Sequence, residues 1–254
     1  MSSEDAPGQN LTRAPIVEAV FDINVETSPG FSLAELSKDA SLAFADKYPI
    51  GRRQVVAQST FELSPAVKPD IQIEQNLEAL QFVAPDRKQL VQVRRTGFSF
   101  NRLSPYSSYE DYINEVREMW DRYKKLTTPV LVRRVGLRFI NRFCLPIENG
   151  ITDLDDFLLT CPKIPRDTDL TFTGFVSQKQ TMTADQQFRA HITLATDKFV
   201  EAEGLWVILD INTFRLHRLP PDSDEIWKIY DSLRLLKNSI FRGMLSNQCL
   251  NLFR

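Results

Sequence analysis

Cysteine and histidine are scarce in this chain of 254 residues, which contains three cysteines and two histidines. The cysteines, Cys144, Cys161 and Cys249, are too few and too scattered to build a disulfide framework or a zinc knuckle. Of the histidines, His191 falls on the polar side of an alternating stretch and has no evident partner that would make it a general base. The thiols fit a reduced compartment, so we expect a cytoplasmic protein whose cysteines and histidines are structural.

Long apolar runs are also missing. The longest, LWVIL at residues 205–209, is far shorter than the roughly 20 residues that a transmembrane helix needs. Residues 1–14 are polar and include two acids, which argues against a signal peptide and against a transit peptide. We therefore expect a disordered tail at residues 1–14 and no contact with a membrane.

The motifs of common catalytic sites are absent as well. The sequence has no G-x-x-x-x-G-K-[ST], G-x-G-x-x-G, G-x-S-x-G or H-E-x-x-H. The stretches FDIN (21–24) and LDIN (209–212) each place an acid and an amide on one strand face, where they could hold a hard cation. Nearby arginines favour salt bridges instead. We therefore expect no metal, no cofactor and no catalytic residue, and we lean towards a protein that is not an enzyme.

The sequence does contain an internal repeat. The same succession of strand and helix patterns occurs twice, and an offset of 116 residues aligns the two copies. We predict that residues 15–128 and residues 129–254 each form a β-α-β-β-β-α unit, which puts the chain in the α+β class. The halves would build antiparallel sheets backed by helices, either joined edge to edge in one curved saddle or packed separately. The predicted strands cover residues 16–26, 54–63, 80–84, 89–101, 132–143, 170–183, 186–196 and 205–216. The predicted helices cover residues 32–47, 107–126 and 152–160, and a last helix opens at Asp222.

The predicted strand at 132–143 carries an arginine at every fourth position, namely Arg134, Arg138 and Arg142. Because strand side chains alternate between the two faces of a sheet, these three arginines share one face. The apolar residues between them can then enter the core. A strand with three cations on one face needs either acids nearby or an anionic ligand.

Acids stand at the equivalent positions of the first strand. Opposite charges on neighbouring strands contribute about 0.2–1 kcal/mol per pair, and they would specify how the two halves dock. The acids that we expect in this charge network are Glu18, Asp22, Glu26 and Asp210. In the alternative interpretation the arginines are in surplus and bind an anion, because guanidinium groups match phosphate and carboxylate oxygens. The candidates for ligand binding are then Arg94, Arg102, Arg134, Arg138 and Arg142.

The basic residues are concentrated in one part of the chain. Residues 87–142 contain 13 Lys or Arg and 5 Asp or Glu, a net charge of +8 in a chain whose total is −2. Such an asymmetry can attract an anionic partner, or acids elsewhere in the fold can neutralise it.

Short sequences in three of the predicted strands resemble those of a known family. PIVEAVFDI (15–23), VGLRFIN (135–141) and LDIN (209–212) are similar in order and spacing to motifs of a sporadically distributed bacterial family of similar length that has no assigned activity. The resemblance implies a bacterial cytoplasmic protein from a mobile or defence-related gene neighbourhood, and it brings no catalytic residues. Phe139 stands where the family usually has tyrosine. The main residues of the resemblance are Pro15, Ile16, Glu18, Gly136, Leu137, Arg138 and Asn141.

Three functions follow from these observations. The first is a non-enzymatic binding or adaptor protein that engages another protein through its sheet face or its helices. The second is a nucleotide or nucleic-acid binding protein that uses the basic segment 87–142, although the overall acidity counts against general affinity for polyanions. The third is a metal- or phosphate-dependent enzyme that uses Glu18, Asp22, Arg138 and Asp210.

Overall fold

A computed structural model of the chain describes residues 11–61, 71–146, 154–163, 173–200 and 204–254. Among these residues the strands are β1 (Ile16–Glu26), β2 (Ile50–Phe61), β3 (Ile71–Val83), β4 (Gln89–Arg94), β5 (Gly97–Leu103), β6 (Leu131–Leu145), β7 (Val176–Met182), β8 (Arg189–Val200) and β9 (Gly204–Leu219). The helices are α1 (Ser37–Phe44), α2 (Tyr109–Thr127), α3 (Leu154–Phe157), α4 (Glu225–Met244) and α5 (Asn247–Asn251).

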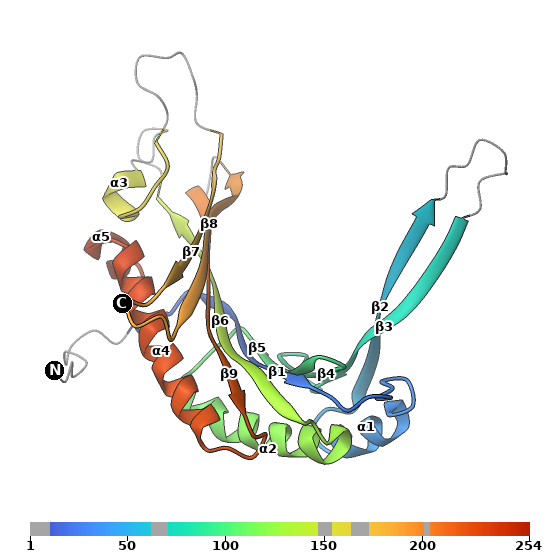
Figure 1. The fold of residues 1–254 in the computed structure, drawn as a ribbon. Coiled ribbons are helices and arrows are strands. Elements are labelled where there is room, and N and C mark those ends of the chain that lie inside the picture. The colour runs from blue at the N-terminus through green and yellow to red at the C-terminus, as the bar shows by residue number, and fades with distance from the viewer. Residues whose placement is uncertain (1–10, 62–70, 147–153, 164–172, 201–203) are drawn as a thin grey trace.

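The strands form one antiparallel sheet in the order β2-β3-β4-β5-β1-β6-β9-β8-β7 (Figure 1). With its helices, this sheet confirms the α+β class. The strands of the two predicted halves meet at the centre of the sheet, where β1 pairs with β6. In that pairing Asp22 lies opposite Gly136, and Asn24 lies opposite Arg134.

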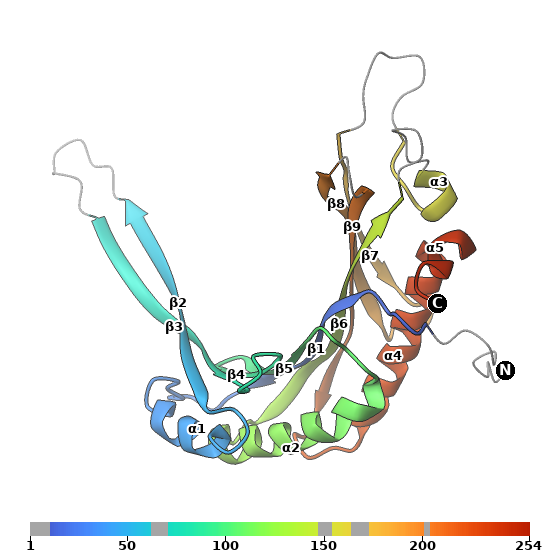
Figure 2. The same ribbon diagram turned by 180° about the vertical axis from the view of Figure 1, so that it is seen from behind.

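The helices α2 and α4 run beneath the central strands, and both ends of the sheet rise on the other side (Figures 1 and 2). One raised end is the β2–β3 hairpin, and the other contains β7, β8 and part of β9. We call the face of the sheet that is turned away from α2 and α4 the inner face. It lies between the two raised ends.

Alternation along the strands separates the core from the inner face. Along β1, Phe21 and Ile23 have no exposed surface, and they belong to a cluster that also contains Leu137 of β6. The rings of Phe21 and Tyr230 are 5.7 Å apart, which links the first strand to the last long helix. Burying a large apolar side chain of this kind stabilises the fold by about 1.5–3 kcal/mol. The two halves therefore share one core. A second cluster lies around α5, β8 and β9.

The predicted strand at residues 89–101 is wrong, because the structure has two strands there. Arg94 pairs with Gly97, so β4 and β5 are joined by a turn of two residues, Arg95 and Thr96. Gly97 has a φ of +151°, and a Cβ at this position would lie 2.2 Å from the Ile23 carbonyl oxygen. Neither turn residue is a glycine or an asparagine, the usual signals of a two-residue turn. The strand pattern of residues 89–101 therefore continues through the turn without a break. The first half is thus β-α-β-β-β-β-α, with one strand more than predicted.

The predicted starts of three helices also need correction. α1 begins at Ser37 and not at Ser32, although the Ser32 hydroxyl accepts a hydrogen bond from the Glu35 amide, as the N-cap of a helix would. α2 begins at Tyr109, two residues later than predicted, with Ser108 as its N-cap. α4 begins at Glu225, three residues after the predicted start at Asp222. The short helix α5 was not predicted.

Parts of four predicted segments, at 1–10, 62–63, 152–153 and 170–172, lie outside the described residues. No helix in the described part of the chain combines the length and the apolar character needed to cross a membrane.

Candidate functional site

A hollow of about 350 Å³ lies on the inner face, over β1, β4, β5, β6 and β9. We call it the inner hollow. Apart from Val20 and Gly136, its lining is polar. The polar residues are Glu18, Asp22, Asn24, Gln92, Arg94, Ser99, Asn101, Arg134, Arg138 and Asn212.

Asp22 holds two arginines at the centre of this hollow. Its Oδ1 accepts a hydrogen bond of 2.7 Å from Nη1 of Arg134, and its Oδ2 accepts one from Nη2 of Arg94. The Asp22 side chain is only 16% exposed, so both ion pairs are largely shielded from water. The three residues come from β1, β4 and β6. One carboxylate thus faces two cations at the point where the halves meet.

Gly136 makes room for the Arg134 side chain. A Cβ at position 136 would lie 2.6 Å from Nη1 of Arg134, so the guanidinium lies directly over this glycine. There it reaches Asp22, donates a 3.1 Å hydrogen bond to Asn212 and stacks on the Phe214 ring at 4.4 Å. Burial lowers the pKa of Arg134, while the Asp22 charge opposes that effect.

Arg138 is paired with Asp210 rather than with the acids of the first strand. Its Nε and Nη2 donate to the two carboxylate oxygens of Asp210 at 2.9 and 2.6 Å. This hydrogen bonding raises the pKa of Arg138, and the negative charge of Glu18 adds to the effect. The Arg138 side chain is 45% exposed, so it still offers part of its guanidinium to the hollow.

A row of amides crosses the sheet beside these ion pairs. Gln81 of β3 donates to Gln92 of β4 at 3.3 Å, and Gln92 donates to Asn101 of β5 at 3.3 Å. Asn101 donates to Glu18 of β1 at 2.7 Å. We call these four residues the amide row. Sequence reasoning missed the three amides, because single polar residues on separate strands form no motif.

The remaining predicted residues lie away from the inner hollow. Arg142 is on the inner face, where it donates to Asp197 at 2.6 Å and stacks on the Trp206 ring at 4.1 Å. Glu26 pairs with Arg133, which is not one of the three regularly spaced arginines.

Arg102 lies on the opposite face from Arg94, which corrects the expectation that both surround one ligand. It pairs in register with Ala19, a core residue, and strand alternation turns its side chain towards the helices. There it donates to the Pro105 carbonyl at 3.1 Å and lies 5.2 Å from the centre of the Tyr112 ring.

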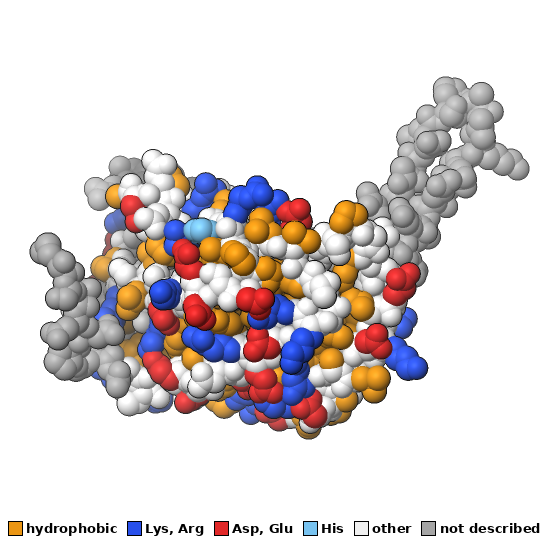
Figure 3. Space-filling view, turned by 60° about the horizontal axis from the view of Figure 1, so that its bottom comes forward, with side chains coloured by type: hydrophobic (Ala, Val, Ile, Leu, Met, Phe, Trp, Pro, Cys, Tyr) orange, Lys and Arg blue, Asp and Glu red, His pale blue; other side chains and the backbone are white. Residues whose placement is uncertain are grey.

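The helix-covered side shows charges of both signs intermixed, with no large area of a single sign (Figure 3). Within the described ranges, no three His, Cys, Asp or Glu side chains come together as a metal site would need. Neither protein-family models nor curated proteins gave a match to this chain. Any functional argument therefore rests on the geometry of the two faces.

Proposed function

We propose that this chain is a non-enzymatic binding or adaptor protein, and that its inner hollow holds a segment of a partner protein. The observation that carries the proposal is the hollow itself. It is a polar depression of about 350 Å³ at the middle of the sheet, between two raised ends. Hydrogen bonds and ion pairs fix its side chains before any partner arrives, which lowers the entropic cost of binding.

The charges of the hollow fit a polypeptide better than a polyanion. The hollow is lined by three arginines, and three carboxylates lie beside them. Nucleic-acid binding needs a surplus of cations that can neutralise phosphates. A peptide backbone instead presents one donor and one acceptor per residue, which matches a lining of mixed amides, arginines and carboxylates. The carboxylates are those of Glu18, Asp22 and Asp210.

One observation favours the second candidate, a nucleotide or nucleic-acid binding protein. The Nε of Arg94 is buried and has no hydrogen-bond partner among the described residues. This arginine also shares its carboxylate with Arg134, so the local charge around Asp22 is positive. A single phosphate or carboxylate oxygen at this point would satisfy the buried donor.

We extend the proposal to the origin and setting of the protein. The two halves, 15–128 and 129–254, would derive from a duplication, with β1 and β6 as counterparts at the centre and β5 and β9 flanking them. The whole sheet would then be the curved saddle. The family resemblance supports a bacterial cytoplasmic protein from a mobile or defence-related gene neighbourhood.

The proposal is tested with a substitution that fills the inner hollow. Val20 of β1 lies in its floor, and Val20→Tyr would occupy the space with a residue that strands accept well. Wild-type and variant proteins are used to capture partners from a lysate of the native host, and retained proteins are identified by mass spectrometry. We expect the partner to be retained by the wild type and lost with Val20→Tyr.

Val130→Tyr is the matched control, because Val130 is 55% exposed and lies outside the hollow. It should retain the partner as the wild type does. A partner that binds all three proteins equally would contradict the proposal. Capture of nuclease-sensitive material that Val20→Tyr abolishes would favour the second candidate instead.

A further inference from the structure

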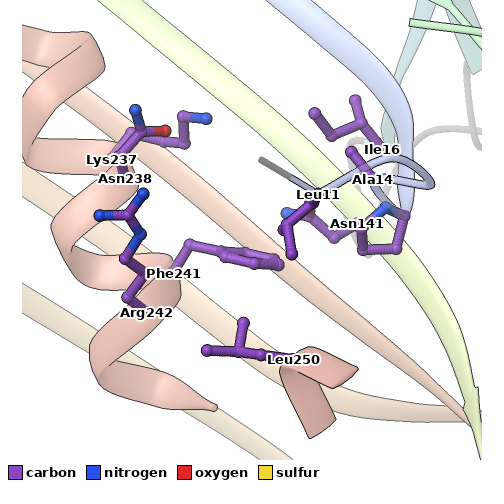
Figure 4. A pocket seen from close by; sticks show the side chains of 10 residues that line it. Leu11, Ala14, Ile16, Asn141, Lys237, Asn238, Phe241, Arg242 and Leu250 are labelled. Atoms are coloured by element: carbon purple, nitrogen blue, oxygen red, sulfur yellow. The ribbon is translucent and has the colours of Figure 1, made fainter. Parts of the chain in front are cut away.

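A second cavity lies on the helix side of the sheet, between α4, α5 and the chain that leads into β1 (Figure 4). Its volume is about 180 Å³. The apolar part of its lining includes Leu11, Ile16, Phe241 and Leu250. It is separate from the inner hollow, so an inference about it does not rest on the proposed function.

The cavity contains a lysine that lacks an acceptor. The Lys237 ammonium lies 4.0 Å from the centre of the Phe139 ring, and no hydrogen-bond acceptor or carboxylate contacts it among the described residues. The residue is partly exposed, and no described side chain offsets the desolvation that lowers its pKa. A cation that lies against an aromatic ring and has no acceptor gains a charge-assisted hydrogen bond when an anion pairs with it.

The charges around Lys237 are of its own sign. Burial lowers the pKa of Lys237 to about 7, and the positive charges of Arg234 and Arg242 on the same helix lower it further. Arg234 is itself paired with Glu110 of α2. The neighbouring elements contribute uncharged groups. Ile16 of β1, Asn141 of β6 and Leu250 of α5 line the cavity, and the Phe139 ring of β6 lies against the Lys237 ammonium.

We propose that this cavity binds a small carboxylate with an apolar body, and that Lys237 pairs with its carboxyl group. The ligand would supply the acceptor that the lysine lacks, and the apolar walls would take the rest of the molecule out of water. The volume of about 180 Å³ sets the size of that body. A cavity of about 150 Å³ admits benzene, so the body is a single ring or an aliphatic chain of about six carbons.

Binding of a carboxylate has a second consequence. A negative charge beside Lys237 favours the charged ammonium, so the ligand raises the pKa of this lysine. At pH 8 the free protein holds Lys237 mostly neutral, because its pKa is about 7. The complex should therefore take up close to one proton per bound ligand at pH 8 and clearly less at pH 6.

The experiment is isothermal titration calorimetry with phenylacetate and hexanoate, each compared with its neutral amide. Titrations at pH 8 in two buffers of different ionisation enthalpy report the proton uptake. We expect at least one of the two acids to bind about tenfold or more tightly than its amide, since a charge-assisted hydrogen bond is stronger than one between neutral groups. A merely structural lysine would give neither this preference nor the proton uptake.

Lys237→Met keeps the length of the apolar stem and should weaken acid binding to the level of the amide. Lys228→Met is its matched control, because Lys228 is an exposed lysine of the same helix, and it should bind as the wild type does. The proposal is overturned if neither acid binds saturably, or if acid and amide bind equally. These two outcomes use the wild-type protein alone, so they decide the question even if Lys237→Met does not fold.

Discussion

At the scale of single residues, Gly136 decides the geometry of the inner hollow. Gly136→Ala would place a methyl group 2.6 Å from the Arg134 guanidinium, which must then leave Asp22. Because this ion pair is largely shielded from water, we expect a loss of about 1–3 kcal/mol in the free energy of unfolding, measured by urea denaturation. Asp22 keeps Arg94, so the fold itself should survive.

Gly51→Ala is the matched control for this substitution. Gly51 lies in β2, and a Cβ there would meet nothing within 4 Å. It should leave stability unchanged or raise it slightly, since alanine restricts the unfolded chain. Equal effects of the two substitutions would show that Arg134 moves aside without cost.

At the scale of elements, periodicity predicted the features that depend on one segment alone, such as the face of a strand or helix on which a residue lies. Alternation placed Arg134 and Arg138 on one face of β6, and helical spacing predicted a helix at residues 107–126, where α2 buries Val116, Trp120 and Tyr123. The partners of the arginines were less accessible, because Arg134 and Asp22 are 112 residues apart in the chain. The sequence also contains no signal for the two-residue turn before Gly97. Glycine is needed at position 97 because β1 approaches closely there, and that approach is a property of the folded chain.

The start of α2 offers a test at this scale. The Ser108 hydroxyl accepts a 3.2 Å hydrogen bond from the Asp111 amide, which satisfies one free donor of the first turn. Ser108→Ala should therefore lower the free energy of unfolding by about 1 kcal/mol in urea denaturation. Ser232→Ala should be neutral or slightly stabilising, because Ser232 lies inside α4, where alanine is the better helix former. Similar losses from both would argue against the Ser108 cap.

At the scale of the whole molecule, we expect the shared core to make the two halves one folding unit. The main cluster joins Phe21 and Trp120 of the first half to Leu137 and Tyr230 of the second. Residues 129–254 alone would expose the edge of β6 and lose these contacts. We expect this fragment to show no cooperative unfolding in urea by circular dichroism.

The full chain should unfold in a single transition. The fluorescence of Trp120 reports on the first half, and that of Trp206 and Trp227 reports on the second. A variant that keeps only Trp120 and a variant that keeps only Trp206 and Trp227 should therefore unfold at the same urea midpoint. A cooperatively folded fragment, or two separate midpoints, would mean that the halves are independent domains.

The amide row gives the inner face a direction. Glu18 as a carboxylate can only accept, so Asn101 must turn its NH₂ towards it and its oxygen towards Gln92. That in turn orients Gln92 towards Gln81, and the choice made at β1 is transmitted to β3. One carboxylate on β1 therefore sets the orientation of amide side chains on three further strands. A partner that lies across the amide row meets hydrogen-bond donors and acceptors in a fixed order. It can therefore bind in one orientation and not in the reverse.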